Sequence, residues 1–276
     1  MSTAVARALH REGSPPWVLD DPLALPLAGD EGLELARHLR SVMQPDEVGS
    51  FSRWVCVRAR VTEDVVEQAN RLGVNQFVIL GAGLDSFAHR RHDLVNRLRI
   101  FEVDHPASQE WKRHRLEELG VQSPASLAYV PVDFETQTLQ QGLEAAGFAF
   151  GAQAVFSWIG VTVYLTLEAI RATLATVESC ATGTQIVLTY DVPPAELSGM
   201  GLRVQEVLAR SATEMGEPFV SWFSDREIDL LLRESGFAEV VLFGPDEAKR
   251  TFFPDREDVR FGGAQRIAIA KVGQAR

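Results

Sequence analysis

Two glycines and two acidic residues are spaced in this sequence as a site for an adenosyl nucleoside requires. Gly81 and Gly83 follow the apolar run 76–80, and Glu102 and Asp104 close the next apolar run. Glycine has no Cβ, so the backbone can approach a ligand closely. A carboxylate at the end of the second strand can accept hydrogen bonds from ribose hydroxyls. This order of strand, glycine turn, helix, strand and acid predicts nucleoside binding.

The glycine loop also indicates which nucleoside is bound. A dinucleotide loop has a third small residue, glycine or alanine, and carries a pyrophosphate at the helix N-terminus. Here that position is Ser86, and Asp85 would repel an anion beside it. S-adenosylmethionine carries an ammonium group and no phosphate, so the loop favours it. A nicotinamide-dependent oxidoreductase is the alternative that Asp85 and Ser86 disfavour.

The elements around these residues are expected to alternate between strand and helix. Parallel strands are expected at 76–80, 99–103, 127–132, 154–157 and 185–190, and an antiparallel edge pair at 239–243 and 266–272. Short loops between alternating strands and helices predict an α/β fold, with a mostly parallel sheet that helices cover on both faces.

Two helical segments fall outside this alternation, residues 1–70 and 193–218. Both can reach the carboxyl edge of the sheet, where ligands of such folds bind. We expect a single domain over residues 1–276, in which 71–192 and 219–276 form the core and the two segments form a lid. The alternative is that these helices only pad the sheet.

Composition excludes several other classes of protein. The chain has 276 residues, 46% of them hydrophobic, and a formal net charge of −11, which argues against nucleic acid as a partner. The basic run 112–115 is expected on a solvated helix face. No run reaches the roughly 20 apolar residues of a membrane helix, and no secretory signal is visible. Cys56 and Cys180 are expected to be free thiols, so a cytoplasmic protein without a membrane partner is predicted.

The chain resembles the leucine carboxyl methyltransferase-like family of S-adenosylmethionine-dependent methyltransferases, and within it the bacterial branch classed as O-methyltransferases. The resemblance covers nearly the whole sequence. Its motifs lie at residues 3–8, 21–24, 57–60, 78–90, 101–106, 132–134, 157–166, 216–218 and 223–237. It implies a class I Rossmann-like methyltransferase fold, S-adenosylmethionine as cofactor and S-adenosylhomocysteine as product.

The resemblance also implies a role for individual residues. Arg58 would bind the cofactor carboxylate, since a guanidinium can pair with it in bidentate geometry. Asp104 would take the ribose hydroxyls, with Glu102 as second candidate, while Asp133 and Phe134 would meet the adenine. Structural alternatives remain open, such as a surface ion pair for Arg58 and a helix cap for Asp133. The full predicted cofactor set is Arg58, Gly81, Ala82, Gly83, Asp85, Glu102, Asp104, Asp133, Phe134 and Ser157.

The acceptor is predicted to be small and partly apolar. Family members that methylate a protein phosphatase carry a glutamate where this chain has Ile159. Trp158, Ile159 and Tyr164 are therefore expected to contact a small molecule such as a secondary metabolite. A carboxylate acceptor or an acidic phenol needs no strong base, so Tyr164 and His105 are weak catalytic candidates that would position the acceptor.

Other interpretations stay open at this point. A protein carboxyl methyltransferase and a nucleoside-binding relative without catalysis are the alternatives. His89 and His92 have a spacing seen in metal sites, but no cysteine or acid completes a set, so no metal is expected. The oligomeric state is not predicted.

Overall fold

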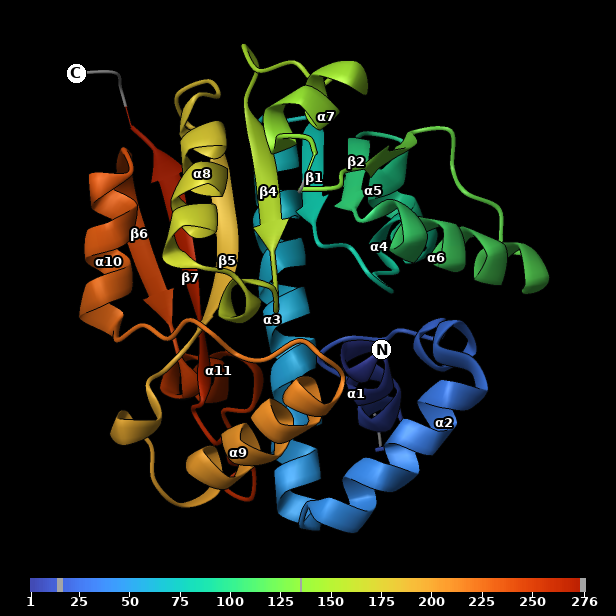
Figure 1. Ribbon diagram of the computed structural model, residues 1–276, viewed down its shortest axis with the longest axis vertical. Helices are drawn as coiled ribbons and strands as arrows, with labels where there is room; N and C mark the ends of the chain where they lie inside the picture. The colour runs from blue at the N-terminus through green and yellow to red at the C-terminus, as the bar shows by residue number, and fades with distance from the viewer. Residues whose placement is uncertain (14–16, 135, 274–276) are drawn as a thin grey trace.

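The computed structural model describes residues 1–13, 17–134 and 136–273 (Figure 1). The predicted lid and core therefore extend slightly beyond the described residues, at 14–16 and 274–276. Among the described residues, no helix is long and apolar enough to cross a membrane.

The centre of the molecule is a seven-stranded sheet in the order β3-β2-β1-β4-β5-β7-β6. All neighbours are parallel except the pairs of β7 with β5 and with β6, which are antiparallel. The predicted fold class is confirmed. The strands are β1 Gln76–Leu80, β2 Arg99–Asp104, β3 Leu127–Pro131, β4 Ala154–Trp158, β5 Gln185–Asp191, β6 Phe237–Phe243 and β7 Gln265–Val272.

Helices cover the sheet on both faces and also lie beyond its carboxyl edge. The N-terminal helices are α1 Ser2–Arg11, α2 Ala24–Val42 and α3 Pro45–Arg71. The helices between strands are α4 Phe87–Arg90, α5 His92–Val95, α6 Pro106–Glu118, α7 Leu139–Ala145, α8 Leu167–Glu178, α9 Gly199–Glu214, α10 Asp225–Glu234 and α11 Pro245–Phe252, with short 3-10 turns η1 Thr162–Tyr164 and η2 Pro194–Glu196.

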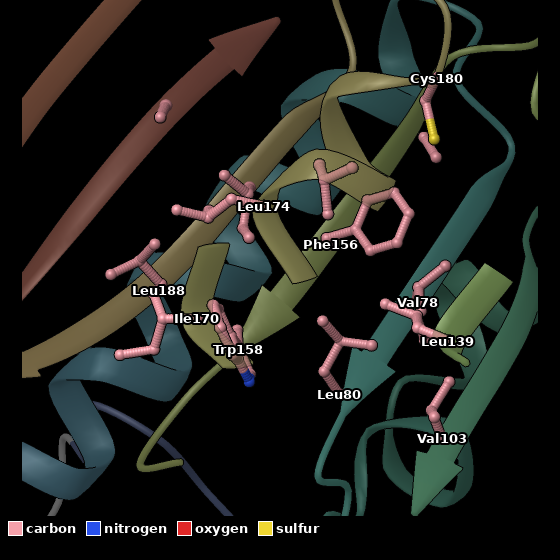
Figure 2. Close-up of a cluster of buried hydrophobic side chains, with 14 of the residues drawn as sticks. Val78, Leu80, Val103, Leu139, Phe156, Trp158, Ile170, Leu174, Cys180 and Leu188 are labelled. Carbon is pink, nitrogen blue, oxygen red and sulfur yellow. The ribbon is translucent and has the colours of Figure 1, made fainter. Parts of the chain in front are cut away.

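One face of the sheet holds the largest apolar cluster (Figure 2). Alternate strand residues point to opposite faces. Phe156 and Trp158 of β4 therefore both pack toward α7, α8 and α10, with Leu174 of α8 and Leu188 of β5 in the same cluster. Apolar side chains pack this face of the sheet against the helices and so hold the strands in place.

The opposite face is covered by α3 and by shorter helices. Val66 and Ala69 of α3 pack with Phe77 and Ile79 of β1. The C-terminal half of α3 is thus part of the core, although the sequence assigned residues 1–70 to a lid. The helix is continuous over 27 residues, so one rigid element joins the sheet face to the region beyond the carboxyl edge.

The helices beyond the carboxyl edge are α1, α2 and α9, together with the first half of α3 (Figure 1). Gly201 of α9 lies so close to the chain before β7 that a Cβ there would meet the carbonyl oxygen of Gly262 at 2.0 Å. Arg203 of α9 also donates from Nε to Oε1 of Glu47 in α3 at 2.6 Å, so the two segments that break the alternation meet on the side where the parallel strands end. Whether they move as a lid stays a prediction.

Candidate functional site

A large cavity of about 660 Å³ opens at the carboxyl ends of β1, β2 and β4. We call it the large cavity. The residues of the predicted site that line it are Arg58, Gly81, Ala82, Gly83, Asp85, Asp104, Ser157, Ile159 and Tyr164. Residues from β1, β4, α3 and the first turns of α1 thus line one cavity at the edge of the sheet where ligands of such folds bind.

The glycine loop after β1 requires glycine at Gly81. Its φ is +64°, in the left-handed region, and a Cβ would lie 2.6 Å from Cγ2 of Val161, which follows β4. Gly83 also has a positive φ, of +47°, with open space beside it. A side chain at Gly81 would collide with the neighbouring loop, whereas one at Gly83 would enter the space where a ligand can lie.

Asp104 ends β2 with its carboxylate facing the large cavity. Its Oδ2 accepts a hydrogen bond from the N–H of Gly83 at 2.5 Å, and its Oδ1 accepts one from the N–H of His105 at 2.7 Å. Each carboxylate oxygen has more than one acceptor direction, so both can still receive a ribose hydroxyl. These bonds fix the carboxylate beside the glycine loop.

Glu102 is not brought to the cavity. It lies two residues earlier on the same face of β2, fully buried, and its Oε2 accepts a hydrogen bond from Nζ of Lys112 at 2.6 Å. Lys112 is itself buried, so the prediction that the run 112–115 forms only a solvated face was wrong for this residue. Burial raises the pKa of Glu102, and the neighbouring Lys112 opposes that shift. The pair anchors α6 to the sheet.

Arg58 projects from α3 toward the ends of β4 and β5. Its Nη1 donates to Oε1 of Gln265 at 2.5 Å, and Nε2 of Gln265 donates to Oδ2 of Asp191 at 2.9 Å. Gln265 and Asp191 are directly paired in the β5–β7 register. Burial lowers the pKa of Arg58 to about 10, so it remains a cation at neutral pH. A Cβ at Gly160 would lie 3.0 Å from Nη2 of Arg58.

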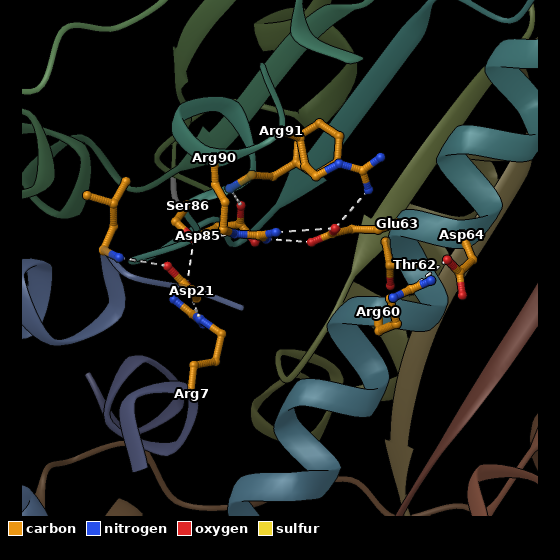
Figure 3. A network of polar contacts seen from close by, with 12 residues as sticks. Arg7, Asp21, Arg60, Thr62, Glu63, Asp64, Asp85, Ser86, Arg90 and Arg91 are labelled. Atoms are coloured by element: carbon orange, nitrogen blue, oxygen red, sulfur yellow. Dashed lines mark hydrogen bonds and ion pairs between the residues drawn. The ribbon is translucent and has the colours of Figure 1, made fainter. Parts of the chain in front are cut away.

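A buried ion pair between α1 and the segment before α2 is hydrogen-bonded to the glycine loop (Figure 3). Nε of Arg7 donates to Asp21 at 2.7 Å, and Nη2 of Arg7 donates to the carbonyl of Leu84 at 2.7 Å. The hydroxyl of Ser86 donates to the same Asp21 oxygen at 2.6 Å. These bonds attach the N-terminal segment to the edge of the large cavity.

A second group of ion pairs joins α3 to the segment that follows the glycine loop. Glu63 of α3 pairs with Arg90 and, at 3.0 Å, with Arg91 (Figure 3). Glu63 also lines the large cavity. The long helix α3 is thus fixed to the segment after the glycine loop by charge-assisted bonds, which are stronger than neutral ones.

A second, mainly apolar cavity of about 110 Å³ adjoins the large cavity. We call it the apolar cavity. Its walls come from α2, α3, α9 and the chain before β7, and include Leu39, Trp54, Val204, Leu208 and Phe261. Arg58, Gly160 and Tyr164 line both cavities. A group bound in one cavity would therefore lie next to a group bound in the other.

Trp158, the last residue of β4, and Ile159, which follows it, face opposite sides of the sheet. Ile159 faces α3 and lines the large cavity, whereas Trp158 points the other way and is buried in the core. The prediction that Trp158 contacts the acceptor therefore needs correcting. Tyr164 lines both cavities, and burial raises the pKa of its phenol. It stays protonated at neutral pH, as expected of a positioning group.

Besides Glu102 and Trp158, three further predicted residues lie outside both cavities. His105 caps α6, where its Nδ1 accepts from the N–H of Ala107 at 3.2 Å. It is not placed to act on an acceptor. Asp133 and Phe134 follow β3, and Phe134 is 65% exposed. Neither is among the lining residues, so their contact with adenine stays a prediction.

Asp191 was not selected from the sequence. It ends β5, is buried, and lines the apolar cavity. Burial raises its pKa to about 6, although Gln265 and Arg58 act in the opposite direction. The available signal was an acid at the carboxyl end of the strand next to β4. The strand was expected to end at residue 190, one residue before this acid.

Two solved structures have a fold similar to that of this chain. The fold matches a DUF574 family protein from Streptomyces avermitilis (15% identity, 99% of this chain and 97% of that one, TM-score 0.65). It also matches a Thermobifida fusca protein solved as a candidate methyltransferase (18% identity, 98% and 94%, TM-score 0.63). At these identities the likeness establishes the fold, which is that of the class I methyltransferases.

The sequence comparisons are more specific. The family model for leucine carboxyl methyltransferase matches residues 1–178. A Bacillus subtilis protein provisionally named an S-adenosyl-L-methionine-dependent methyltransferase, YktD, is 31% identical over 281 residues, covering 93% of this chain and 91% of its own. A similarly named Mycobacteroides abscessus protein is 28% identical, covering 83% and 76%. The chain belongs to the leucine carboxyl methyltransferase family, and the predicted family is confirmed.

Proposed function

We propose that this chain transfers the methyl group of S-adenosylmethionine to an oxygen atom of a small molecule. The observation that supports it most is the pair of adjoining cavities, which share Arg58, Gly160 and Tyr164. The large cavity has the volume and the polar groups that a nucleoside amino acid needs. The apolar cavity would take the acceptor.

The residues present fit the cofactor. The open side of Gly83 leaves room for a ligand against the backbone. Asp104 would hold the ribose hydroxyls, Arg58 the carboxylate and Asp85 the ammonium group. Bound there, the cofactor supplies an electrophilic methyl group on a sulfonium, whose sulfide is a good leaving group.

The protein's contribution is mainly placement. Methyl transfer needs the acceptor oxygen in line with the methyl carbon and the sulfur, and holding that geometry can supply much of the rate enhancement. Tyr164 lines both cavities and Ile159 lines the large one, and we expect them to set the approach of the acceptor. The apolar walls would exclude water, which competes as a nucleophile.

The small size of the apolar cavity favours a small molecule over a protein. A protein carboxyl terminus would have to thread past α9 into a space of about 110 Å³. Carboxylate and hydroxyl acceptors both remain within the proposal at this point. The family description, leucine carboxyl methyltransferase, points to the former.

The test is a screen with methyl-labelled S-adenosylmethionine against single-ring carboxylic acids and phenols. We expect label in at least one small-molecule product, and none with heat-unfolded protein. Mild base releases the label from an ester and leaves it in an ether. Label that appears only in added protein, at carboxyl termini, would contradict the small-molecule acceptor.

A further inference from the structure

The apolar cavity has a charge distribution that selects among acceptors. Arg58 and Asp191 are the charged residues among the described residues that line it. In the proposed function Arg58 is engaged by the cofactor carboxylate. The charge left facing the acceptor is then the Asp191 carboxylate, held on a wall that is otherwise mainly hydrocarbon.

The Asp191 side chain is held in place by one oxygen and leaves the other open. Its Oδ2 accepts from Nε2 of Gln265 at 2.9 Å, and Oδ1 accepts no hydrogen bond from the described residues. Gln265 is in turn fixed by Nη1 of Arg58 at 2.5 Å. Asp191 lies on the face of β5 that α3 covers, as Ser157 does on β4, so its side chain is on the side of the sheet where the two cavities meet.

A carboxylate acceptor would suit this cavity poorly. Two anionic groups would face each other with few polar neighbours, and a buried like-charge pair is unfavourable. A neutral hydroxyl would instead donate a hydrogen bond to the open oxygen of Asp191, and such charge-assisted bonds are short and strong.

The volume of the apolar cavity limits the size of the acceptor group that can enter it. An engineered apolar cavity of about 150 Å³ in another protein takes a benzene molecule. The apolar cavity here, at about 110 Å³, is of the size of one ring, and aromatic side chains such as Phe219 and Phe261 form part of its wall.

We infer that the acceptor is a neutral hydroxyl compound with about one ring, and that Asp191 contacts the hydroxyl and takes its proton. The inference rests on the proposed function and narrows it. As the hydroxyl oxygen forms its bond to the methyl carbon, the methyl–sulfur bond breaks with its electrons staying on sulfur. The hydroxyl proton passes to Oδ1 of Asp191, so the products are a methyl ether, a neutral sulfide and a protonated carboxyl, which later releases the proton to water.

The surroundings of Asp191 support this use. Burial raises its pKa to about 6, so it is mostly ionised at neutral pH yet basic enough to accept a proton. The ionisable groups that face it are Arg58 from α3 and Tyr164 from η1, with the neutral amide of Gln265 from β7. Tyr164 keeps its proton at neutral pH, so it does not compete as the base.

A binding experiment tests the charge selection without turnover. Calorimetry of the complex with S-adenosylhomocysteine compares 4-methylphenol with 4-methylbenzoate at pH 7.5. We expect at least tenfold tighter binding of the phenol by the wild type, and a preference at least tenfold smaller in Asp191→Asn. That variant keeps the acceptor atom for Gln265 and removes the charge. Tighter binding of the benzoate by the wild type would overturn the inference.

A kinetic experiment tests the proton transfer. For 4-methylphenol, Asp191→Asn should lose kcat by about 10²–10⁴-fold, the usual range for a general base, with unchanged affinity for S-adenosylhomocysteine. The wild-type rate should rise as pH increases through about 6, because the base must be ionised, and Asp191→Asn should lack this rise. The more acidic 4-nitrophenol should recover much of the lost rate.

Gln265→Ala separates a chemical role from a positioning role. It removes the bond that holds Asp191 but keeps the carboxylate, so we expect a loss of about tenfold with the rise in rate near pH 6 retained. An Asp191→Asn variant that is folded, binds S-adenosylhomocysteine and methylates 4-methylphenol at the wild-type rate would overturn the inference. A wild type that selects the phenol in binding yet transfers methyl to no acceptor would instead overturn the proposed function, while the charge selection by Asp191 would stand.

Discussion

Arg58 is the residue on which the two cavities depend together, because it lines both and is fixed to Gln265. We expect Arg58→Ala to weaken cofactor binding by roughly 1.5–3 kcal/mol, since the cofactor carboxylate loses a charge-assisted partner. Asp104→Ala should have an effect of similar size through the ribose. Titration calorimetry with S-adenosylhomocysteine measures both.

The matched control is Arg60→Ala, on the same helix. Arg60 is half exposed and pairs with Asp64 one turn away, so its removal should leave cofactor affinity unchanged within error. Equal affinity for the wild type, Arg58→Ala and Asp104→Ala would show that the roles carried over from the family do not apply to these residues.

Gly81 and Gly120 together separate the effect of backbone strain from the effect of a steric contact with Val161. Alanine at a left-handed position costs about 1–2 kcal/mol, and at Gly81 its Cβ would also press on Val161. Gly120 has a similar φ of +67° with nothing within 4 Å. We therefore expect Gly81→Ala to lower cofactor affinity at least tenfold and Gly120→Ala to leave it unchanged. A similar loss in both would argue against the close approach.

Residues at strand ends were predictable from the sequence only where the strand limits were right. Gly81 and Asp104 were found because apolar runs end directly before them. Trp158 was assigned to the acceptor surface because sequence proximity to Ile159 hides that alternate residues face opposite sides. Asp191 and Gln265 are 74 residues apart, and their contact depends on the β5–β7 register, which no local pattern contains.

At the scale of elements, a buried ion pair contributes to holding the N-terminal segment in place. The side chain of Asp21 is fully buried and that of Arg7 nearly so. Removing one partner of such a pair leaves an uncompensated charge and costs about 3–5 kcal/mol. Asp21→Asn should lower the free energy of unfolding by about that amount, measured by urea titration at pH 7.

The control for this variant is its neighbour in sequence. Asp20 forms an exposed pair with Arg11, so Asp20→Asn should change stability by at most about 1 kcal/mol. Burial alone would raise the pKa of Asp21, but Arg7 and Ser86 outweigh it and hold the pKa below the ordinary 3.8. The contribution of Asp21 is thus present above pH 3.8 and lost as pH falls through the lower folded-state pKa, where wild type and Asp21→Asn should converge. A constant difference down to pH 2 would contradict this assignment.

The lid hypothesis concerns α1 and α9. Both lie beyond the carboxyl edge, while the rear half of α3 is fixed in the core. We expect hydrogen exchange of α1 and α9 to slow on adding S-adenosylhomocysteine, because lids order around a ligand. Helix α10, on the far face, should not change. Unchanged exchange in α1 and α9 would leave them as padding of the sheet.

The positions of helices and strands were more predictable from the sequence than the contacts between side chains of different elements. The helix at α10 follows from Ser224 and Glu227, whose reciprocal capping bonds are present. Local chemistry fixes such an end. Lys112 was not predictable in this way. Its charged neighbours in sequence indicated an exposed side chain, whereas the structure shows a buried ion pair with Glu102. Burial of a charge depends on a partner from another element, which the sequence does not specify.

At the scale of the whole molecule, a single sheet positions two adjoining cavities at its carboxyl edge. The N-terminal helices and α9 close that edge, and α3 connects them rigidly to the sheet. This arrangement brings residues from the first 60 positions against β5 and β7. The family membership and the fold agree with it.

The measurement that tests the central claim most directly is calorimetric titration of the wild-type protein with S-adenosylhomocysteine and, separately, with NAD. We expect one site per chain with roughly micromolar affinity, about −8 kcal/mol, and binding of NAD at least a hundredfold weaker, because Asp85 would repel a pyrophosphate and Ser86 stands where a dinucleotide loop has glycine or alanine. Equal or tighter binding of NAD would contradict the account.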